Sequence, residues 1–211
     1  MPASDSVKNI GAVLDSQMKM DKQVNQICKS AWYNLYQLGK IKRYLSESQL
    51  KSVIQAFVVS KLDMNNGLLA GLPKYLISKL QSVQNASAKF VSGMNRYDQI
   101  EPPLKELHWL PVKHRIDFKL LLLCYKSLNG HGPEYLKELL VPYVPARTLR
   151  SSNASILVEP RSTMKTYGDR AFGSVAPRLW NKLPATVKER PSVDSFKKAL
   201  KTHMFKTVFD C

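Results

Sequence analysis

Acidic residues are the scarce class in this chain. Its 211 residues contain 16 Asp and Glu against 32 Lys and Arg, so the formal net charge is +16 at pH 7. An excess of this size does not define a fold, but it favours polyanionic partners. Nucleic acid is the first candidate, an anionic membrane the second and an acidic protein surface the third. With 44% hydrophobic residues, the chain has enough apolar material to bury a core.

Cysteines and long apolar runs are also few. Cys28, Cys124 and Cys211 are odd in number and far apart in sequence, which argues against a disulfide framework. We therefore expect a reducing, intracellular location, with nucleus and cytoplasm not distinguished. The longest apolar run, from Leu120 to Tyr125, is far short of the ~20 residues that cross a bilayer. The N-terminus carries no apolar signal segment, so neither export nor membrane association is expected.

Clustered carboxylates are lacking as well. The chain has no adjacent Asp-Asp pair and no tight group of Asp and Glu, whereas polymerases and nucleases hold Mg²⁺ with such groups. It also has no Cys-x-x-Cys motif, and Cys124 lies in an apolar stretch where core packing is the expected role. We expect no cofactor, no metal site and no catalysis by this chain alone.

Helical periodicity is the strongest pattern that is present. Apolar residues recur at three- and four-residue spacing from Met20 and predict a helix that Asp21 caps and Gly39 ends. Ser46 and Gln49 have the spacing of a capping box, which predicts a second helix to about residue 63.

A third helix is predicted from Pro73 to about Gly93. Three helices with short connections form an antiparallel bundle. A short apolar run at 8–15 predicts a strand before the bundle, and the segment from Arg96 to Pro103 reads as a turn after it.

The rest of the chain reads as a second helical region that prolines interrupt. Helices are predicted over 111–128, 133–140, about 175–183, and from a cap at Ser192 or Asp194 to about residue 206. Between 141 and 191 we otherwise expect loops and short strands. The predicted fold class is mainly α: a helical bundle, then a helical and irregular basic region, with one or two short N-terminal strands.

The basic excess is concentrated in this second region. Residues 141–206 hold thirteen Lys and Arg against four Asp and Glu, a net +9, whereas residues 101–140 carry only +1. Aromatic residues, among them Phe172 and Trp180, are interleaved with these cations. Cations neutralise phosphates and aromatic rings stack on bases, so the segment is a candidate nucleic-acid surface. The alternative is that Phe172 and Trp180 belong to the core. The candidate cations are Arg147, Arg150, Arg161, Lys165, Arg170, Arg178 and Lys182.

A second group of candidate cations lies in the bundle. Its members are Lys40, Lys42 and Arg43 at the turn after the first helix, and Lys74, Lys79 and Lys89 along the third. The turn cluster also has a purely structural explanation, because cations stabilise the carbonyl end of a helix. We therefore expect it to contribute less to binding than the C-terminal arginines.

Several short motifs occur in an order that resembles one known family. They are Asn9-Ile-Gly-Ala-Val-Leu-Asp15, Leu68-Leu-Ala-Gly-Leu-Pro73, Leu107-His-Trp-Leu-Pro111, Arg115-Ile-Asp-Phe118, Tyr167-Gly-Asp-Arg170, Ala176-Pro-Arg-Leu-Trp-Asn181-Lys-Leu-Pro184 and Phe196-Lys-Lys-Ala-Leu200. The set is similar to the C-terminal part of LINE-type (non-LTR) retrotransposon reverse transcriptases, with fish elements most alike. The Leu-His-Trp-Leu-Pro and Pro-Arg-Leu-Trp-Asn blocks are specific in combination.

The resemblance implies an organisation and a function. Residues 1–18 would correspond to the last palm strand, 19–95 to the thumb, and 96–211 to the region after the thumb. The catalytic palm of this RNA-directed DNA polymerase, with its Asp-Asp strand, precedes the part that the chain resembles. The implied role is a non-catalytic grip on template RNA or primer–template duplex through the phosphates, with little sequence preference. Asp63-Met-Asn-Asn66 departs from the family's Asp-Tyr-Cys-Asn-like run, and a C-terminal zinc knuckle is lacking.

A rival interpretation belongs to another class. The chain would then be a helical protein-interaction module, or a translated element remnant with no selected function, that self-associates through uncovered apolar faces. The two interpretations differ in salt dependence, because counterion release weakens phosphate binding steeply while apolar association is insensitive to salt.

Overall fold

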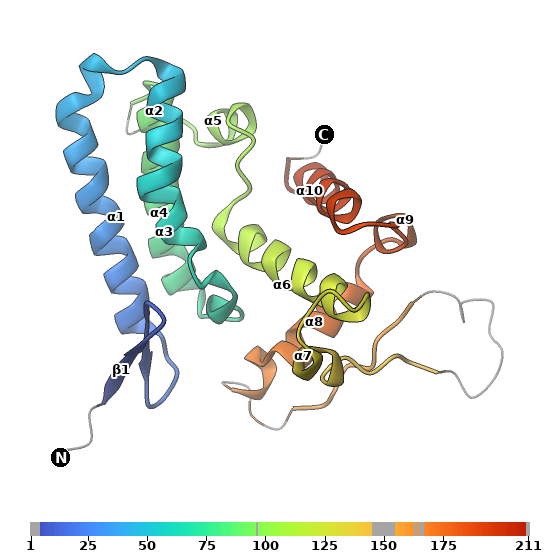
Figure 1. Ribbon diagram of the computed structural model, residues 1–211. Helices are drawn as coiled ribbons and strands as arrows, with labels where there is room; N and C mark the ends of the chain where they lie inside the picture. Colours follow the sequence, from blue (N-terminus) through green and yellow to red (C-terminus); the bar gives the residue numbers. More distant parts are fainter. Residues whose placement is uncertain (1–4, 96, 145–154, 163, 165–166, 210–211) are drawn as a thin grey trace. The chain divides into compact units, whose positions relative to one another are not determined.

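The structure is a computed structural model that describes residues 5–95, 97–144, 155–162, 164 and 167–209. It is mainly helical and begins with a short two-stranded antiparallel hairpin, as predicted (Figure 1). The chain divides into two compact units, Met1–Arg115 and Ile116–Cys211, which are described separately. No helix in the described ranges has both the length and the apolar character needed to cross a membrane.

The hairpin joins β1 (Ser6–Asn9) to β2 (Ala12–Asp15) in register, with Asn9 opposite Ala12. Ile10 and Gly11 form the turn with φ values of 45° and 79°. A two-residue hairpin turn whose twist matches that of the flanking strands needs a positive φ at both central residues. The predicted strand at 8–15 is therefore two short strands folded back on each other.

The start of the first helix is organised by Asp15. Its carboxylate accepts hydrogen bonds from the backbone N–H groups of Lys19 and Met20, both at 2.8 Å. Helix α1 (Asp21–Ile41) then begins without a side-chain cap. The prediction that Asp21 caps it is wrong, because Asp21 is already the first helical residue. Its carboxylate instead accepts from the Tyr75 hydroxyl at 2.9 Å.

The end of α1 also differs from the prediction. The helix continues through Gly39 to Ile41 and passes into a 3₁₀ turn, η1 (Lys42–Tyr44). A glycine inside a helix costs about 1 kcal/mol relative to alanine. The helix nevertheless continues for two residues beyond Gly39, so Gly39 does not end it.

The second predicted helix is confirmed, capping box included. Ser46 N–H donates to Gln49 Oε1 at 2.9 Å, and Gln49 N–H donates to Ser46 Oγ at 3.4 Å. The helix comprises α2 (Glu47–Ile54), a π-helical turn η2 (Gln55–Val59) and α3 (Ser60–Asp63).

The third helix, α4 (Lys74–Val91), runs parallel to α1 and packs on it, and the second helix runs the opposite way and packs against both (Figure 1). Three contacts in increasing order along both helices fix this direction: Asp21 with Tyr75, Asn25 with Lys79, and Lys42 with Phe90. Pro73 is the residue before the helix rather than its first residue. The buried core of the bundle includes Val24, Ile27, Ala31, Leu35, Ile54, Val58, Leu62, Leu76, Leu80 and Val83.

A short 3₁₀ turn, η3 (Asn66–Leu69), leads into α4, and a short helix, α5 (Glu101–Glu106), follows it. The prediction of a turn up to Pro103 is wrong in its last residues. The two prolines of this segment occupy the first helical positions, where a missing N–H costs nothing. Buried Gln84 then donates its Nε2–H to the carbonyl of Leu110 at 2.8 Å and holds the segment after α5 on α4.

The second unit has an aromatic core. Its elements are most of α6 (Val112–Leu128), then α7 (Glu134–Glu138), η4 (Gly168–Arg170), α8 (Phe172–Asn181), α9 (Ala185–Lys188) and α10 (Val193–Phe209). Tyr125 stacks on Phe196 with ring centroids 4.1 Å apart, and Trp180 lies 6.0 Å from the same ring. Ser192 caps α10 by accepting from Ser195 N–H at 3.2 Å.

The Asp15 turn gives a stability prediction. Burial on its own would raise the pKa of Asp15, but hydrogen bonds from backbone N–H groups, led by Lys19 and Met20, outweigh it and lower the pKa from 3.8. A carboxyl whose pKa falls on folding stabilises the fold above its unfolded pKa, and the contribution is lost as pH falls through the folded pKa. Asp15→Asn should therefore cost about 1 kcal/mol at pH 7, and the difference should shrink below pH ~3.8. Urea unfolding at pH 7 and pH 3 checks this, and an equal difference at both pH values would contradict it.

Candidate nucleic-acid interface

The predicted cations do not form one cluster. Arg147, Arg150 and Lys165 lie outside the described residues. The remainder divide between the units: Lys40, Lys42, Arg43, Lys74, Lys79 and Lys89 in the first, and Arg161, Arg170, Arg178 and Lys182 in the second. Each unit therefore presents its own group of candidate phosphate ligands.

In the second unit, Tyr143 and Tyr167 are 52% and 44% exposed and open to stacking, but Trp180 is not. Trp180 is only 3% exposed and donates its indole N–H to the carbonyl of Ser155 at 2.8 Å. It is a core residue, so the alternative interpretation of Trp180 is the correct one. Arg178 also faces an acidic partner, Asp169, at 3.9 Å. Arg161 and Lys182 are exposed.

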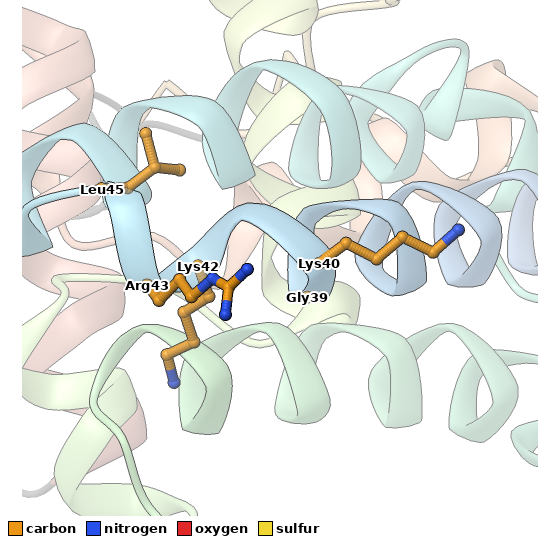
Figure 2. A pocket seen from close by; sticks show the side chains of 5 residues that line it. All are labelled: Gly39, Lys40, Lys42, Arg43 and Leu45. Atoms are coloured by element: carbon orange, nitrogen blue, oxygen red, sulfur yellow. The ribbon is translucent and has the colours of Figure 1, made fainter.

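In the first unit, Lys42 has a structural role. Its Nζ donates to the carbonyl of Phe90 at 2.8 Å and lies 4.5 Å from the centroid of the Phe90 ring. This carbonyl belongs to the last turn of α4, where the orphan acceptors of a helix need donors. Lys42 therefore ties η1 to α4, and Figure 2 shows it reaching toward that helix while Lys40 extends along α1.

The other predicted cations of the bundle differ in how far contacts within the protein already engage them. Lys79 donates to Asn25 Oδ1 at 3.0 Å, and Lys89 donates to the carbonyl of Asp98. Lys40 is exposed and lies over the ring of Tyr36, with 4.7 Å from Nζ to the centroid. Arg43 and Lys74 are likewise exposed, so these three are the most open to a phosphate among the six predicted cations of the bundle.

Sequence reasoning missed the aromatic residues that accompany these cations. Trp32, Tyr33 and Tyr36 on α1 are 45%, 61% and 67% exposed. The sequence pattern could have identified them, because the buried apolar stripe of α1 passes through Ala31 and Leu35 and these three aromatic residues lie outside it. The sequence-based prediction placed base-stacking aromatic residues only in the irregular C-terminal segment.

Cations and aromatics meet where α1 lies beside α4. We call this surface the α1–α4 seam and define it by Trp32, Tyr36, Lys40, Lys42, Arg43, Tyr75, Lys79 and Phe90. A shallow pocket of about 480 Å³ lies on it, lined mainly by Trp32, Tyr36 and Phe90 with Lys40 at its side. A second hollow of about 840 Å³ continues past Lys40 to Lys42 and Arg43 (Figure 2).

The electrostatics of the seam follow from the sequence of its helices. No Asp or Glu occurs between residues 22 and 46, a stretch with five Lys and Arg, or between residues 64 and 97. Acidic residues adjoin both ends of the seam. Asp21 accepts a hydrogen bond from the Tyr75 hydroxyl, which raises the pKa of Tyr75, and Glu47 and Glu106 line a hollow together with Lys42. Between these ends α1 carries basic residues and no acidic ones, so the field along it is positive.

The arrangement offers groups that can bind phosphates and flat rings. Exposed cations can neutralise phosphates, and exposed rings can stack on flat groups. Among the described residues there is no group of three or more His, Cys, Asp or Glu that could hold a metal ion.

Comparisons of the chain with protein-family models, with curated proteins and with solved structures gave no match.

The two roles assigned to neighbouring lysines can be separated by stability. Lys42→Met removes the hydrogen bond to the Phe90 carbonyl and should cost about 1 kcal/mol, which lowers the melting temperature by about 4 °C. Lys40→Met removes the same charge from an exposed position and should cost less than about 0.5 kcal/mol. Thermal unfolding followed by circular dichroism compares the two, and equal losses would show that Lys42 is not a structural cap.

Proposed function

We propose that this chain is a non-catalytic nucleic-acid-binding protein that holds RNA or DNA through its phosphates without strong sequence preference. The observation that carries the proposal is the α1–α4 seam, where exposed cations and exposed aromatic rings share a surface free of acidic side chains between residues 22 and 46. Phosphate contacts position a nucleic acid without reading its bases, so affinity should depend on salt far more than on sequence.

The absence of acidic residues matters as much as the presence of basic ones. A carboxylate among the cations would repel a phosphate backbone and would pair with a lysine in the free protein. Between Lys22 and Ser46 the sequence offers no such competitor. The exposed cations Lys40 and Arg43 instead lie over the rings of Tyr36 and Tyr44, at 4.7 and 4.8 Å. A ring holds a cation weakly at an exposed site, so the charge stays available to a phosphate.

The resemblance to LINE-type reverse transcriptases supports the same proposal. The α1–α4 seam lies within residues 19–95, the part that resembles a polymerase thumb, and thumb helices hold template RNA or primer–template without doing chemistry. On this proposal the polymerase activity of such an element would need carboxylates that this chain lacks.

A second candidate function is self-association, and one surface favours it. Ile10 in the hairpin turn is 87% exposed, and Met64 and Leu68 near the end of α3 are 45% and 42% exposed. Asn65 joins these segments by donating its Nδ2–H to the carbonyl of Ile10 at 2.9 Å. An apolar surface of this kind would bind a second copy or a protein partner, with little dependence on salt.

Matched charge-removal variants test the main proposal. The seam variant replaces Lys40, Arg43 and Lys79 by Gln, and the control replaces Arg161, Lys182 and Lys198 by Gln. All six residues are exposed, and each variant removes two lysines and one arginine. Each lost phosphate contact should reduce the salt slope by about 0.7 for a single strand. The seam variant should therefore lose about two units of slope, and the control well under one.

Fluorescence anisotropy with a labelled oligonucleotide between 25 and 200 mM salt gives both slopes. Equal losses in the two variants would show that net charge alone, not the α1–α4 seam, provides the binding. No binding at low salt, or affinity that does not change with salt, would overturn the proposal and leave self-association as the leading function.

A further inference from the structure

We infer that the α1–α4 seam is selective for single-stranded nucleic acid, because unpaired bases stack on Trp32 and Tyr36 while the surrounding cations hold the phosphates. This inference rests on the proposed function and adds the form of nucleic acid that the surface accepts. It makes the aromatic rings, rather than the charges, the source of selectivity.

The two rings are placed to receive bases. Trp32 and Tyr36 are one helical turn apart, so they lie on the same side of α1 and flank one shallow pocket of about 480 Å³. This volume falls in the range of pockets that hold small organic groups. In the part of the chain that the structure describes, the Trp32 ring makes no hydrogen bond and no ring contact, and it is 45% exposed. Its face is open to a flat partner.

The cations lie close against the rings, and Lys40 occupies one face of Tyr36. Lys40 Nζ lies 4.7 Å from the Tyr36 centroid, and Lys42 Nζ lies 4.5 Å from that of Phe90 at the edge of the same pocket. A nucleotide with its base against the rings would carry its phosphate to these cations. Stacking of this kind accepts every base, because each has a flat face.

A double helix cannot make the same contacts. Its bases are stacked on one another at 3.4 Å per strand, so their faces are covered. Side chains one turn apart on a helix are separated by about 6 Å along the axis, and rings at that separation match bases that have been splayed apart. A duplex could reach the cations but would leave both rings unused.

An acidic polypeptide is the competing occupant, and the pocket argues against it. Its carboxylates would satisfy Lys40 and Arg43, but it would bring no planar groups to the open faces of Trp32 and Tyr36. The charge complementarity of the seam, together with two exposed rings beside the cations, therefore favours a strand with alternating phosphates and planar bases.

Tryptophan fluorescence of the chain can report base stacking on Trp32. It has three tryptophans; Trp109 and Trp180 are 5% and 3% exposed, so Trp32 is the solvent-exposed one. Titration of the full chain with a 20-nucleotide oligothymidylate should quench the exposed part of the emission and protect it from iodide. A hairpin duplex with the same number of phosphates should bind about tenfold more weakly and leave the emission nearly unchanged.

Neutral variants separate stacking from charge. Trp32→Leu with Tyr36→Leu keeps good helix formers at exposed positions and changes no charge. It should weaken oligothymidylate binding about tenfold or more, change duplex binding less than twofold and leave the salt slope intact. Tyr135→Leu is the matched control, because Tyr135 is 66% exposed on α7 of the second unit, and it should bind as the parent does.

Each outcome decides the inference. Equal, salt-dependent binding of strand and duplex, or a double variant that binds oligothymidylate as tightly as the parent, would overturn base stacking while leaving the proposed function standing. If the parent chain binds neither the strand nor the duplex, both the inference and the proposed function are overturned. Displacement of oligothymidylate by polyglutamate at equal charge concentration would identify an acidic-protein site instead. If the double variant fails to fold, unchanged Trp32 emission in the parent at saturation would overturn the inference.

Discussion

The parallel packing of α1 against α4 is the interaction on which the first unit depends. Each helix has one apolar stripe, and Val24, Ile27 and Ala31 of α1 are buried with Leu76 and Leu80 of α4. Two parallel helices in one chain need a return element, which the segment 47–63 supplies. Because the apolar stripes face inward, the basic and aromatic residues of α1 lie on the outer surface, and the seam is a consequence of how the core is built.

On the proposed function, the same side chains along this surface serve both structure and binding. Lys42 holds the end of α4 through the Phe90 carbonyl, and Tyr75 engages Asp21 at the other end of the helix pair. The first contact fixes one cation beside the pocket, and the second ties α1 to α4 at the other end of the seam. The shape of the seam is thus preorganised, which lowers the cost of ordering when a ligand binds.

Much of the fold could be predicted from local signals. The capping box at Ser46 and the apolar helix over 111–128 were predictable, because each depends on residues within a few positions of one another. Two of the predictions that failed concern the ends of α1, where the structure departs from the local sequence signal. Gly39 lies inside α1, which ends at Ile41, and Asp21 does not cap α1 because Asp15 already organises that turn.

The candidate site was predicted by its charge and missed in its aromatic part. Lys40, Lys42 and Arg43 could be found from sequence, but which lysine supports the fold depends on a carbonyl about fifty residues away. Trp180 lies between Arg178 and Lys182 in the sequence and Trp32 follows Lys29, yet Trp180 is in the core and Trp32 is exposed. Only the packing of each helix decides between them.

Photocrosslinking tests the central claim most directly. An oligonucleotide with iodouridine at alternate positions would be bound to the full chain at low salt, irradiated, and its attachment sites mapped by mass spectrometry. The account predicts cross-links on α1 and α4, with Trp32 and Tyr36 foremost. Cross-links confined to residues 116–209, or to the hairpin at 6–15, would contradict it.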